Sequence, residues 1–285
     1  MTDNYHSSNA KERSMIDVKN ISFKYAGQQA LVFDDFSLQL EQNRIYGLLG
    51  KNGTGKSTLL YLIAGLLRPA AGTVCCDGTA TCLRRPELLS DLFLVPEEFE
   101  LPAMSLAKYV GLNAPFYPRY SKEVLERCLA DFELTPDVQL GALSMGQKKK
   151  VFMSFALATG TRYLLMDEPT NGLDIPSKSQ FRKAIANNMS EERTLLISTH
   201  QVHDVESLLD HILMLSQREL LLDSSVQDIT DRYVFEFRSP QQMDDVLYAE
   251  PTLQGNAVVA RRKEGDAETP LNLELLFNAV TQGKI

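Results

Sequence analysis

Short apolar runs alternate with amphipathic stretches along most of the chain. The run Ile45–Leu49 ends at a glycine-rich loop, after which apolar residues recur at helical spacing over 57–67. The same succession returns later, with predicted helices over 147–159 and 177–189 and predicted strands over 163–166 and 194–198. Apolar strands that alternate with helices are typical of a buried, mostly parallel sheet. The pattern therefore predicts an α/β core.

Two internal segments depart from this alternation. Strand-like pieces at 21–25 and 36–40, joined by a turn, predict an antiparallel β edge. Between about 98 and 148, prolines separate short helical stretches such as 121–132. This second segment is predicted to be a helical insertion in the α/β core.

The end of the chain has a pattern of its own. Residues 233–237 and 257–260 are strand-like, and Thr269-Pro270 precedes a helical pattern over 271–280. We expect a small α+β extension without a recognisable motif. The predicted organisation is a polar tail at 1–14, a main domain at 15–225 that contains the helical subdomain at about 98–148, and an accessory extension at 226–285.

Composition narrows the class of protein. The 285 residues are 44% hydrophobic, and 29 basic side chains face 37 acidic ones, so the chain lacks the basic surplus of nonspecific nucleic-acid binders. No apolar run approaches the roughly 20 residues that cross a bilayer, and the polar opening does not resemble a secretory signal. The four cysteines lack C-x-x-C spacing, which indicates reduced thiols. We expect a cytoplasmic protein.

Residues 50–57, GKNGTGKS, fit the phosphate-loop pattern G-x-x-x-x-G-K-[ST] between a predicted strand and a predicted helix. The glycines let the backbone turn its N–H groups toward phosphates. Lys56 would reach the β- and γ-phosphates, and Ser57 would ligate Mg²⁺. A glycine-rich turn without a ligand is the alternative. The predicted binding positions are Gly50, Asn52, Gly53, Gly55, Lys56, Ser57 and Thr58.

Two adjacent carboxylates, Asp167 and Glu168, follow the apolar strand at 163–166. Successive strand residues point in different directions, so the two side chains can take different roles. Asp167 can hold Mg²⁺, and Glu168 can take a proton from an attacking water. Alone, the pair could be a solvated strand end, but a phosphate loop in the same chain favours the catalytic interpretation.

The sequence L-S-M-G-Q at 143–147, together with these two motifs, resembles the signature of ATP-binding cassette (ABC) ATPases, which is usually L-S-G-G-Q. Further matches occur in family order at Tyr25, at 171–174, which correspond to the D-loop, and at His200, which corresponds to the switch histidine. The resemblance covers about 16–225. It implies a P-loop NTPase fold, the use of ATP and Mg²⁺, and a head-to-tail dimer of two ABC subunits in which each ATP lies between the phosphate loop of one and the signature helix of the other.

The resemblance also implies roles for the signature and the D-loop. Ser144, Gly146 and Gln147 would address the γ-phosphate held by the partner, and Asp174 would contact the opposite subunit near Glu168. A plain helix N-cap remains the alternative for the signature, as does a helix-capping role for Asp174. Met145 replaces the first signature glycine.

For two aromatic side chains, the resemblance implies contacts with the nucleotide. Tyr25 would stack on the adenine, with packing in the core as the alternative. His200 would donate a hydrogen bond to the γ-phosphate. His203 and His211 match no motif and are interpreted as ordinary helix residues, and residues 148–150 as a solvated helix face rather than a nucleic-acid site.

The clearest departure from the family pattern is Glu97, where glutamine is usual at a position that touches Mg²⁺. A carboxylate can ligate Mg²⁺, but it adds negative charge beside the triphosphate. We therefore hypothesise tighter metal dependence or slower turnover than a glutamine would give. A shifted alignment, with Glu97 on a surface loop, is the alternative.

Three functions are compatible with these motifs. The favoured one is the ATP-hydrolysing subunit of a transporter, bound to the inner face of the membrane through a separately encoded permease whose cytoplasmic helix would enter a groove at about 97–120. Overall resemblance to exporters of the bacitracin-resistance kind favours export. A soluble ABC protein that acts on ribosomes or chromosomes is disfavoured by the single cassette and short insertion. A regulator without hydrolysis would not need Glu168.

Overall fold

Six strands form the central sheet. The structure is a computed structural model that describes residues 15–253 and 255–285, so the predicted tail at 1–14 lies outside the described residues. The strands are β3 (Ile45–Leu49), β6 (Leu92–Val95), β7 (Tyr163–Asp167), β8 (Thr194–Thr199), β9 (His211–Ser216) and β10 (Glu219–Ser225). Their order is β10-β9-β3-β8-β7-β6, and every pairing except that of β10 is parallel. The predicted α/β core is confirmed.

The strands β3, β7 and β8 are buried along their whole length, as their apolar sequences require. Leu49 of β3 pairs with Thr199 of β8, and Asp167 of β7 pairs with Ser198 of β8. Because parallel strands in this register end at one edge of the sheet, the loops that follow them lie together. That edge carries the phosphate loop, the acidic pair and His200.

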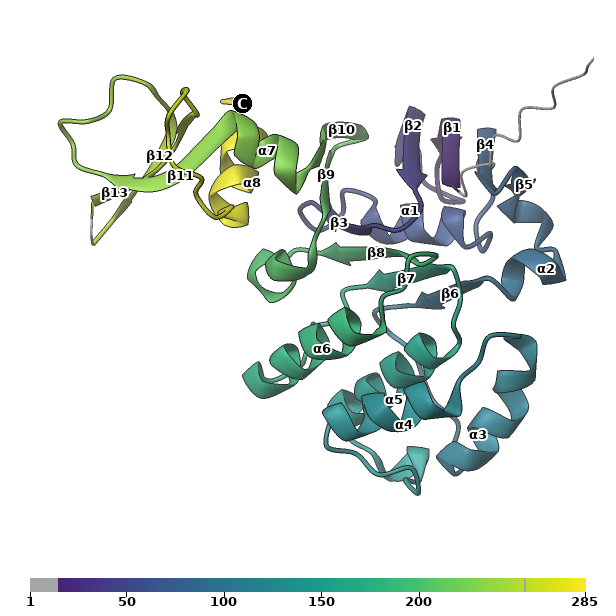
Figure 1. Cartoon of the computed structure of the whole chain (residues 1–285). Coiled ribbons are helices and arrows are strands. Elements are labelled where there is room, and N and C mark those ends of the chain that lie inside the picture. The colour runs from purple at the N-terminus through teal and green to yellow at the C-terminus, as the bar shows by residue number, and fades with distance from the viewer. Residues whose placement is uncertain (1–14, 254) are drawn as a thin grey trace, which may run out of the picture.

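The predicted antiparallel edge is a second sheet, and its strands are longer than the sequence pattern indicated. It consists of β1 (Met15–Phe23), β2 (Phe33–Glu41), β4 (Ala71–Cys76) and β5 (Thr79–Ala80), in the order β2-β1-β4-β5. The helix α1 (Lys56–Ile63) lies between the two sheets (Figure 1). It ends earlier than predicted, since the chain turns at Gly65, which has a φ of 67°.

Helices cover the opposite face of the central sheet (Figure 1). Phe155 in this layer is fully buried and contacts the rings of Tyr109, Tyr117 and Tyr120, which ties the helical insertion to the core. The helices are α3 (Leu106–Asn113), α4 (Lys122–Asp131), α5 (Met145–Ala158) and α6 (Ile175–Asn188). The remaining short helices of this part are α2 (Pro86–Leu89) and 3₁₀ turns at Thr81–Leu83, Ala114–Phe116, Leu140–Ala142, Val202–Asp204 and Glu206–Leu208.

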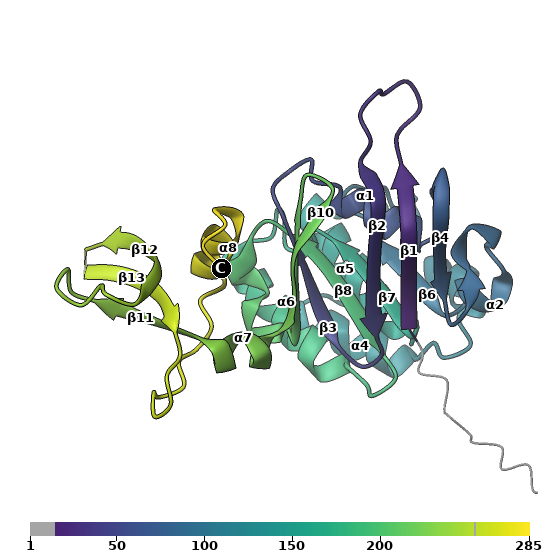
Figure 2. The same ribbon diagram turned by 90° about the horizontal axis from the view of Figure 1, so that it is seen from above.

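The C-terminal residues form a small antiparallel sheet and two helices. The elements are α7 (Val226–Arg232), β11 (Tyr233–Arg238), β12 (Val246–Thr252), β13 (Gly255–Arg261) and α8 (Leu273–Thr281), and the strand order is β11-β13-β12. Figure 2 shows this sheet to one side of the main body, with α8 between it and the central sheet. The helix α8 begins later than predicted, because Asn272 caps it. Thr269, where the helix was expected to open, accepts a hydrogen bond from the backbone N–H of Phe235.

Some sequence-based interpretations are corrected by the fold, and others agree with it. His211 is the first residue of β9 and not a helix residue, whereas His203 lies in a 3₁₀ turn. Cys75, Cys76, Cys82 and Cys128 are free thiols. No helix in the described part of the chain is both long enough and apolar enough to cross a membrane.

Arg193 joins three elements of the core from a position that is almost fully buried. Its guanidinium donates hydrogen bonds to the carbonyls of Leu157 (3.1 Å), Thr161 (3.1 Å) and Asn188 (3.0 Å). Burial lowers the pKa of Arg193 to about 10, so the guanidinium is still charged at neutral pH. The side chain thus satisfies carbonyls at the ends of α5 and α6 and before β7.

Replacing Arg193 with methionine should lower the free energy of unfolding by about 3 kcal/mol, because three buried carbonyls each lose a charged donor. Urea unfolding followed by circular dichroism measures this change. Lys122→Met is the control, since the ion pair of Lys122 with Glu126 is exposed on the helix surface, and it should change stability by less than about 0.5 kcal/mol. Equal stabilities for the two variants would contradict the prediction.

Candidate functional site

The phosphate loop is closed by backbone geometry that its glycines allow. Gly53 and Gly55 have φ values of 81° and 103°, and a Cβ atom on Gly50 would lie 2.6 Å from the carbonyl oxygen of Leu215. Within the described structure no side chain caps α1. The first N–H groups of α1 therefore lack a side-chain acceptor, which fits a site for phosphate oxygens.

Lys56 links this loop to the acidic pair. The side chain is 7% exposed, and its ammonium donates a hydrogen bond of 2.8 Å to the carbonyl of Gly50. The same Nζ atom lies 3.6 Å from Oε1 of Glu168. Lys56 and the predicted general base Glu168 therefore lie close together, and both side chains are largely shielded from solvent.

Asp167 has one carboxylate oxygen without a hydrogen-bond partner among the described residues. Its Oδ1 atom accepts a hydrogen bond from the Ser198 hydroxyl, whereas its buried Oδ2 atom has no hydrogen-bond partner among the described residues. Burial raises the pKa of Asp167, and hydrogen bonds from Ser198 and Ser57 act in the opposite direction. An unpaired carboxylate oxygen beside a serine hydroxyl is a donor set that fits Mg²⁺.

Glu168 and His200 form the second contact at this edge. Nδ1 of His200 lies 2.8 Å from Oε1 of Glu168, and the His200 backbone donates to Oε2 at 3.3 Å. Glu168 has a φ of 44°, a left-handed conformation that is uncommon for a residue other than glycine. The Glu168 N–H donates to the carbonyl of Ser198 at 3.0 Å, which holds this turn against β8. Two of the three predicted catalytic side chains, Glu168 and His200, thus lie in contact.

Glu97, on the loop after β6, lies beside the D-loop. Its Oε1 atom accepts a hydrogen bond of 2.8 Å from the side-chain amide of Asn171, and its side chain is half-buried.

Tyr25 reaches the other end of the phosphate loop, where its hydroxyl lies 3.0 Å from Oγ1 of Thr58. The Tyr25 ring also packs edge-on against Phe23, at 5.0 Å between centroids.

The signature residues begin α5, in the helical layer. Ser144 and Gln147 cap the helix reciprocally, through hydrogen bonds of 3.0 and 3.3 Å, and Met145 is 62% exposed. In the described chain no hydrogen bond or ion pair joins the signature to the phosphate loop. Asp174 caps α6 by accepting from the Ser177 backbone at 3.0 Å. The two capping alternatives from the sequence are therefore real contacts of this single chain.

Comparison with known proteins identifies the family. Residues 33–171 match the sequence profile of the family described as ABC transporter. A zinc uptake system ATP-binding protein, ZurA, of Listeria innocua is 30% identical over 228 residues, which is 75% of this chain and 87% of that protein. The chain belongs to the ABC transporter ATP-binding subunits. It is therefore a member of a family of ATPases coupled to transport.

Other relatives and solved structures agree with this family. A Nod factor export ATP-binding protein I of Cupriavidus metallidurans is 26% identical over 224 residues, 76% of this chain and 73% of that protein. A solved ATP-binding subunit of an ABC transporter is 25% identical with a TM-score of 0.67, covering 75% of this chain and 91% of that one. A bacterial Atm1-family ABC exporter with ATP bound shares the fold, with 23% identity, a TM-score of 0.65 and coverage of 76% and 39%.

Two residues that contact the acidic pair of this ABC subunit were not recognised in the sequence. Ser198, which holds Asp167, lies in the segment that also carries His200. Lys149 was assigned to a solvated helix face, but it is 5% exposed and donates to the carbonyl of Glu168 at 3.0 Å. Helical spacing gave a signal, since Lys149 lies four residues before the buried Met153 on α5.

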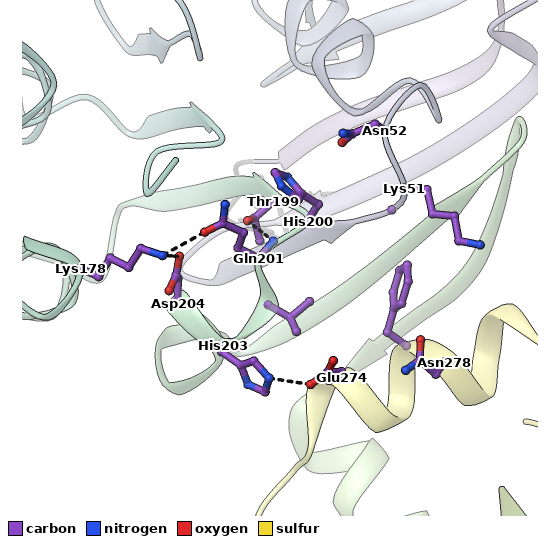
Figure 3. Close-up of a pocket in the computed structure, with 13 residues that line it drawn as sticks. Lys51, Asn52, Lys178, Thr199, His200, Gln201, His203, Asp204, Glu274 and Asn278 are labelled. Carbon is purple, nitrogen blue, oxygen red and sulfur yellow. Dashed lines mark hydrogen bonds and ion pairs between the residues drawn. The ribbon is translucent and has the colours of Figure 1, made fainter. Parts of the chain in front are cut away.

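A cavity of about 620 Å³ adjoins the site on the side of the C-terminal helix. Figure 3 shows Lys51, Asn52 and His200 on one side of it and Glu274 and Asn278, from α8, on the other. His203 lies 2.7 Å from Glu274 and thereby joins the segment after His200 to α8. The extension thus forms one wall of this cavity.

The Glu97→Gln variant should turn over ATP about fivefold faster and need more Mg²⁺ for half-maximal activity. The physical reason is that the sequence hypothesis places the Glu97 charge beside the triphosphate, where its loss would be an effect of about 1 kcal/mol. Steady-state ATPase rates across a Mg²⁺ titration measure both quantities. Glu98→Gln, at the exposed neighbouring position, is the control. An unchanged rate and an unchanged Mg²⁺ requirement in Glu97→Gln would refute the hypothesis.

Proposed function

We propose that this chain hydrolyses ATP within a head-to-tail dimer and thereby powers a separately encoded membrane permease. The observation that carries the proposal is the contact of the buried Lys56 and Glu168 with the more exposed His200 at the edge of the sheet. The cluster supplies a cation for the phosphates, a carboxylate base and a hydrogen-bonding imidazole. A regulator that only binds nucleotide would have no use for the base.

In the proposed reaction, Glu168 accepts a proton from the attacking water, and His200 donates a hydrogen bond to the γ-phosphate. Lys56, which contacts the loop carbonyl of Gly50 here, turns to the β- and γ-phosphates when ATP is bound. Ser57, Asp167 and Glu97 are the residues that would hold Mg²⁺, which when bound neutralises phosphate charge. The remaining proposed nucleotide contacts are Tyr25 at the adenine and Gly50, Asn52, Gly53, Gly55 and Thr58 at the phosphates.

The signature residues act on the ATP of a second ABC subunit. Ser144, Gly146 and Gln147 lie at the N-terminal end of α5, where N–H groups and the helix dipole favour a phosphate. They are not fully buried in this chain, and Asp174 is exposed, which leaves them accessible to a partner. Met145 adds an exposed apolar side chain to the same face.

The proposed division of labour follows the chain. Residues 15–225 form the ATPase domain, the helical subdomain at about 98–148 meets the permease, and residues 226–285 are an accessory extension. The insertion exposes Leu112 (56%) and Phe116 (69%), apolar side chains suited to a helix of the permease. The protein would then be peripheral on the inner face of the cell membrane, without nucleic acid as a partner.

For the direction of transport we propose export, as in transporters of the bacitracin-resistance kind. The support is the overall resemblance in the sequence together with a relative named for Nod factor export. A relative named for zinc uptake is also similar, so the permease must be identified to decide the direction.

The Glu168→Gln variant should bind ATP with Mg²⁺ but lose at least about 99% of its hydrolysis, because an amide cannot accept the proton from water. ATPase assays and gel filtration with ATP measure this, and dimers should accumulate. Glu192→Gln, an exposed carboxylate on the loop before β8, is the control and should keep its full rate. A Glu168→Gln variant with an unchanged rate would show that the base is another group.

Co-purification tests the transporter assignment. The tagged chain is isolated from gently solubilised membranes of its native host, and stoichiometric companions are identified by mass spectrometry. A polytopic membrane protein is the expected companion, and its relatives and substrate would decide between export and uptake. Ribosomal or chromosomal companions without a membrane protein would overturn the transporter proposal.

A further inference from the structure

Lys149 is one of two buried lysines in the described chain, the other being Lys56 of the phosphate loop. Its ammonium donates hydrogen bonds to the carbonyls of Glu168 at 3.0 Å and of Asn171 at 2.9 Å. Lys149 therefore reaches from the signature helix α5 into the turn after β7. Burying an ammonium costs free energy unless it is paired, so a lysine at this buried position requires a physical explanation.

The turn that Lys149 holds determines where the Glu168 carboxylate points. Glu168 has a φ of 44°, and its carbonyl also accepts from the backbone N–H of Asn171 at 3.1 Å. Without the ammonium, the carbonyl of Asn171 would lose a charged donor and the left-handed conformation would lose a restraint. The hydrogen bonds of Lys149 are thus placed to fix the backbone of the proposed base.

Charge gives a second reason for a lysine at this position. Burial lowers the pKa of Lys149, while the carboxylates of Glu97, Glu168 and Asp167 act to raise it. Glu97 is connected to the same turn, because it accepts a hydrogen bond of 2.8 Å from the side chain of Asn171. The turn therefore lies between a buried cation on α5 and the additional carboxylate at position 97.

We propose that Lys149 is a positioning residue for ATP hydrolysis, which fixes the Glu168–Asn171 turn and balances the charge of Glu97. The inference rests on the proposed function, since it assumes that Glu168 is the base. Lys149 and the signature cap Ser144 lie on one continuous helix, α5. A displacement of that helix by a partner subunit would consequently move the donor that holds the base, which couples dimer closure to its orientation.

The experiment compares Lys149→Met with Lys150→Met in the full-length protein. Lys150 lies on the same helix but contacts Gln180 on α6, so its loss reports general effects on packing. For Lys149→Met we expect kcat to fall at least about tenfold, or ~1.4 kcal/mol, while KM for ATP stays within about twofold. For Lys150→Met we expect kcat within about twofold of wild type.

A double-mutant cycle separates positioning from stability. Glu97→Gln should raise kcat by a larger factor in the Lys149→Met background than in the wild type, because the carboxylate bonded to Asn171 then lies at a turn that has lost the nearby ammonium. A purely structural Lys149 would give the same factor in both backgrounds, and that result would overturn the proposal. An unchanged kcat in Lys149→Met would overturn it as well.

Two further controls keep the result interpretable. If Lys149→Met does not fold, Lys149→Gln, which keeps a donor but not the charge, is measured in the same double-mutant cycle, and an equal effect of Glu97→Gln in both backgrounds refutes the proposal. Absence of Mg²⁺-dependent hydrolysis in the wild type, or full activity in Glu168→Gln, would refute the proposed function itself. Activity that depends on Glu168 but not on Lys149 would refute only this inference.

Discussion

The parallel register of β3, β8 and β7 is the constraint on which the site depends. It aligns Leu49 with Thr199 and Asp167 with Ser198, so three loops leave the sheet at the same level. The strands are apolar and fully buried, and a slip by one residue would turn every side chain to the other face. Burial of the sheet thereby fixes the relative positions of the phosphate loop, the acidic pair and His200.

Charges at this edge are held in place by one another. Lys56 and Lys149 are both buried and both contact Glu168, one from the phosphate loop and one from the signature helix. Each ammonium donates hydrogen bonds to backbone carbonyls, so it keeps hydrogen-bond partners that do not depend on the carboxylates. The energetic cost of burying these ions is offset only if the surrounding hydrogen bonds are complete, which accounts for the dense contacts of Ser198 and Asn171.

Local patterns were sufficient where the chemistry is local. The phosphate loop, the acidic pair and the signature are contiguous in the sequence, and their loops follow from glycine content and from the ends of apolar strands. The half-exposed strand β12 was missed because its pattern has no clean alternation. His211 was assigned to a helix, but it begins β9. Lys149 was assigned to solvent because a charged side chain is usually exposed, although its helical spacing places it with buried residues of α5.

The sequence by itself determined the α/β core, the family motifs and the departures at Met145 and Glu97, since each depends on residues near one another in the chain. Only the tertiary structure decided that Lys149 faces the turn after β7, that Glu97 contacts Asn171, and that α8 borders the cavity beside His200. These contacts join elements distant in sequence, and their geometry depends on how helices pack on the sheet, which hydrophobic periodicity alone does not specify.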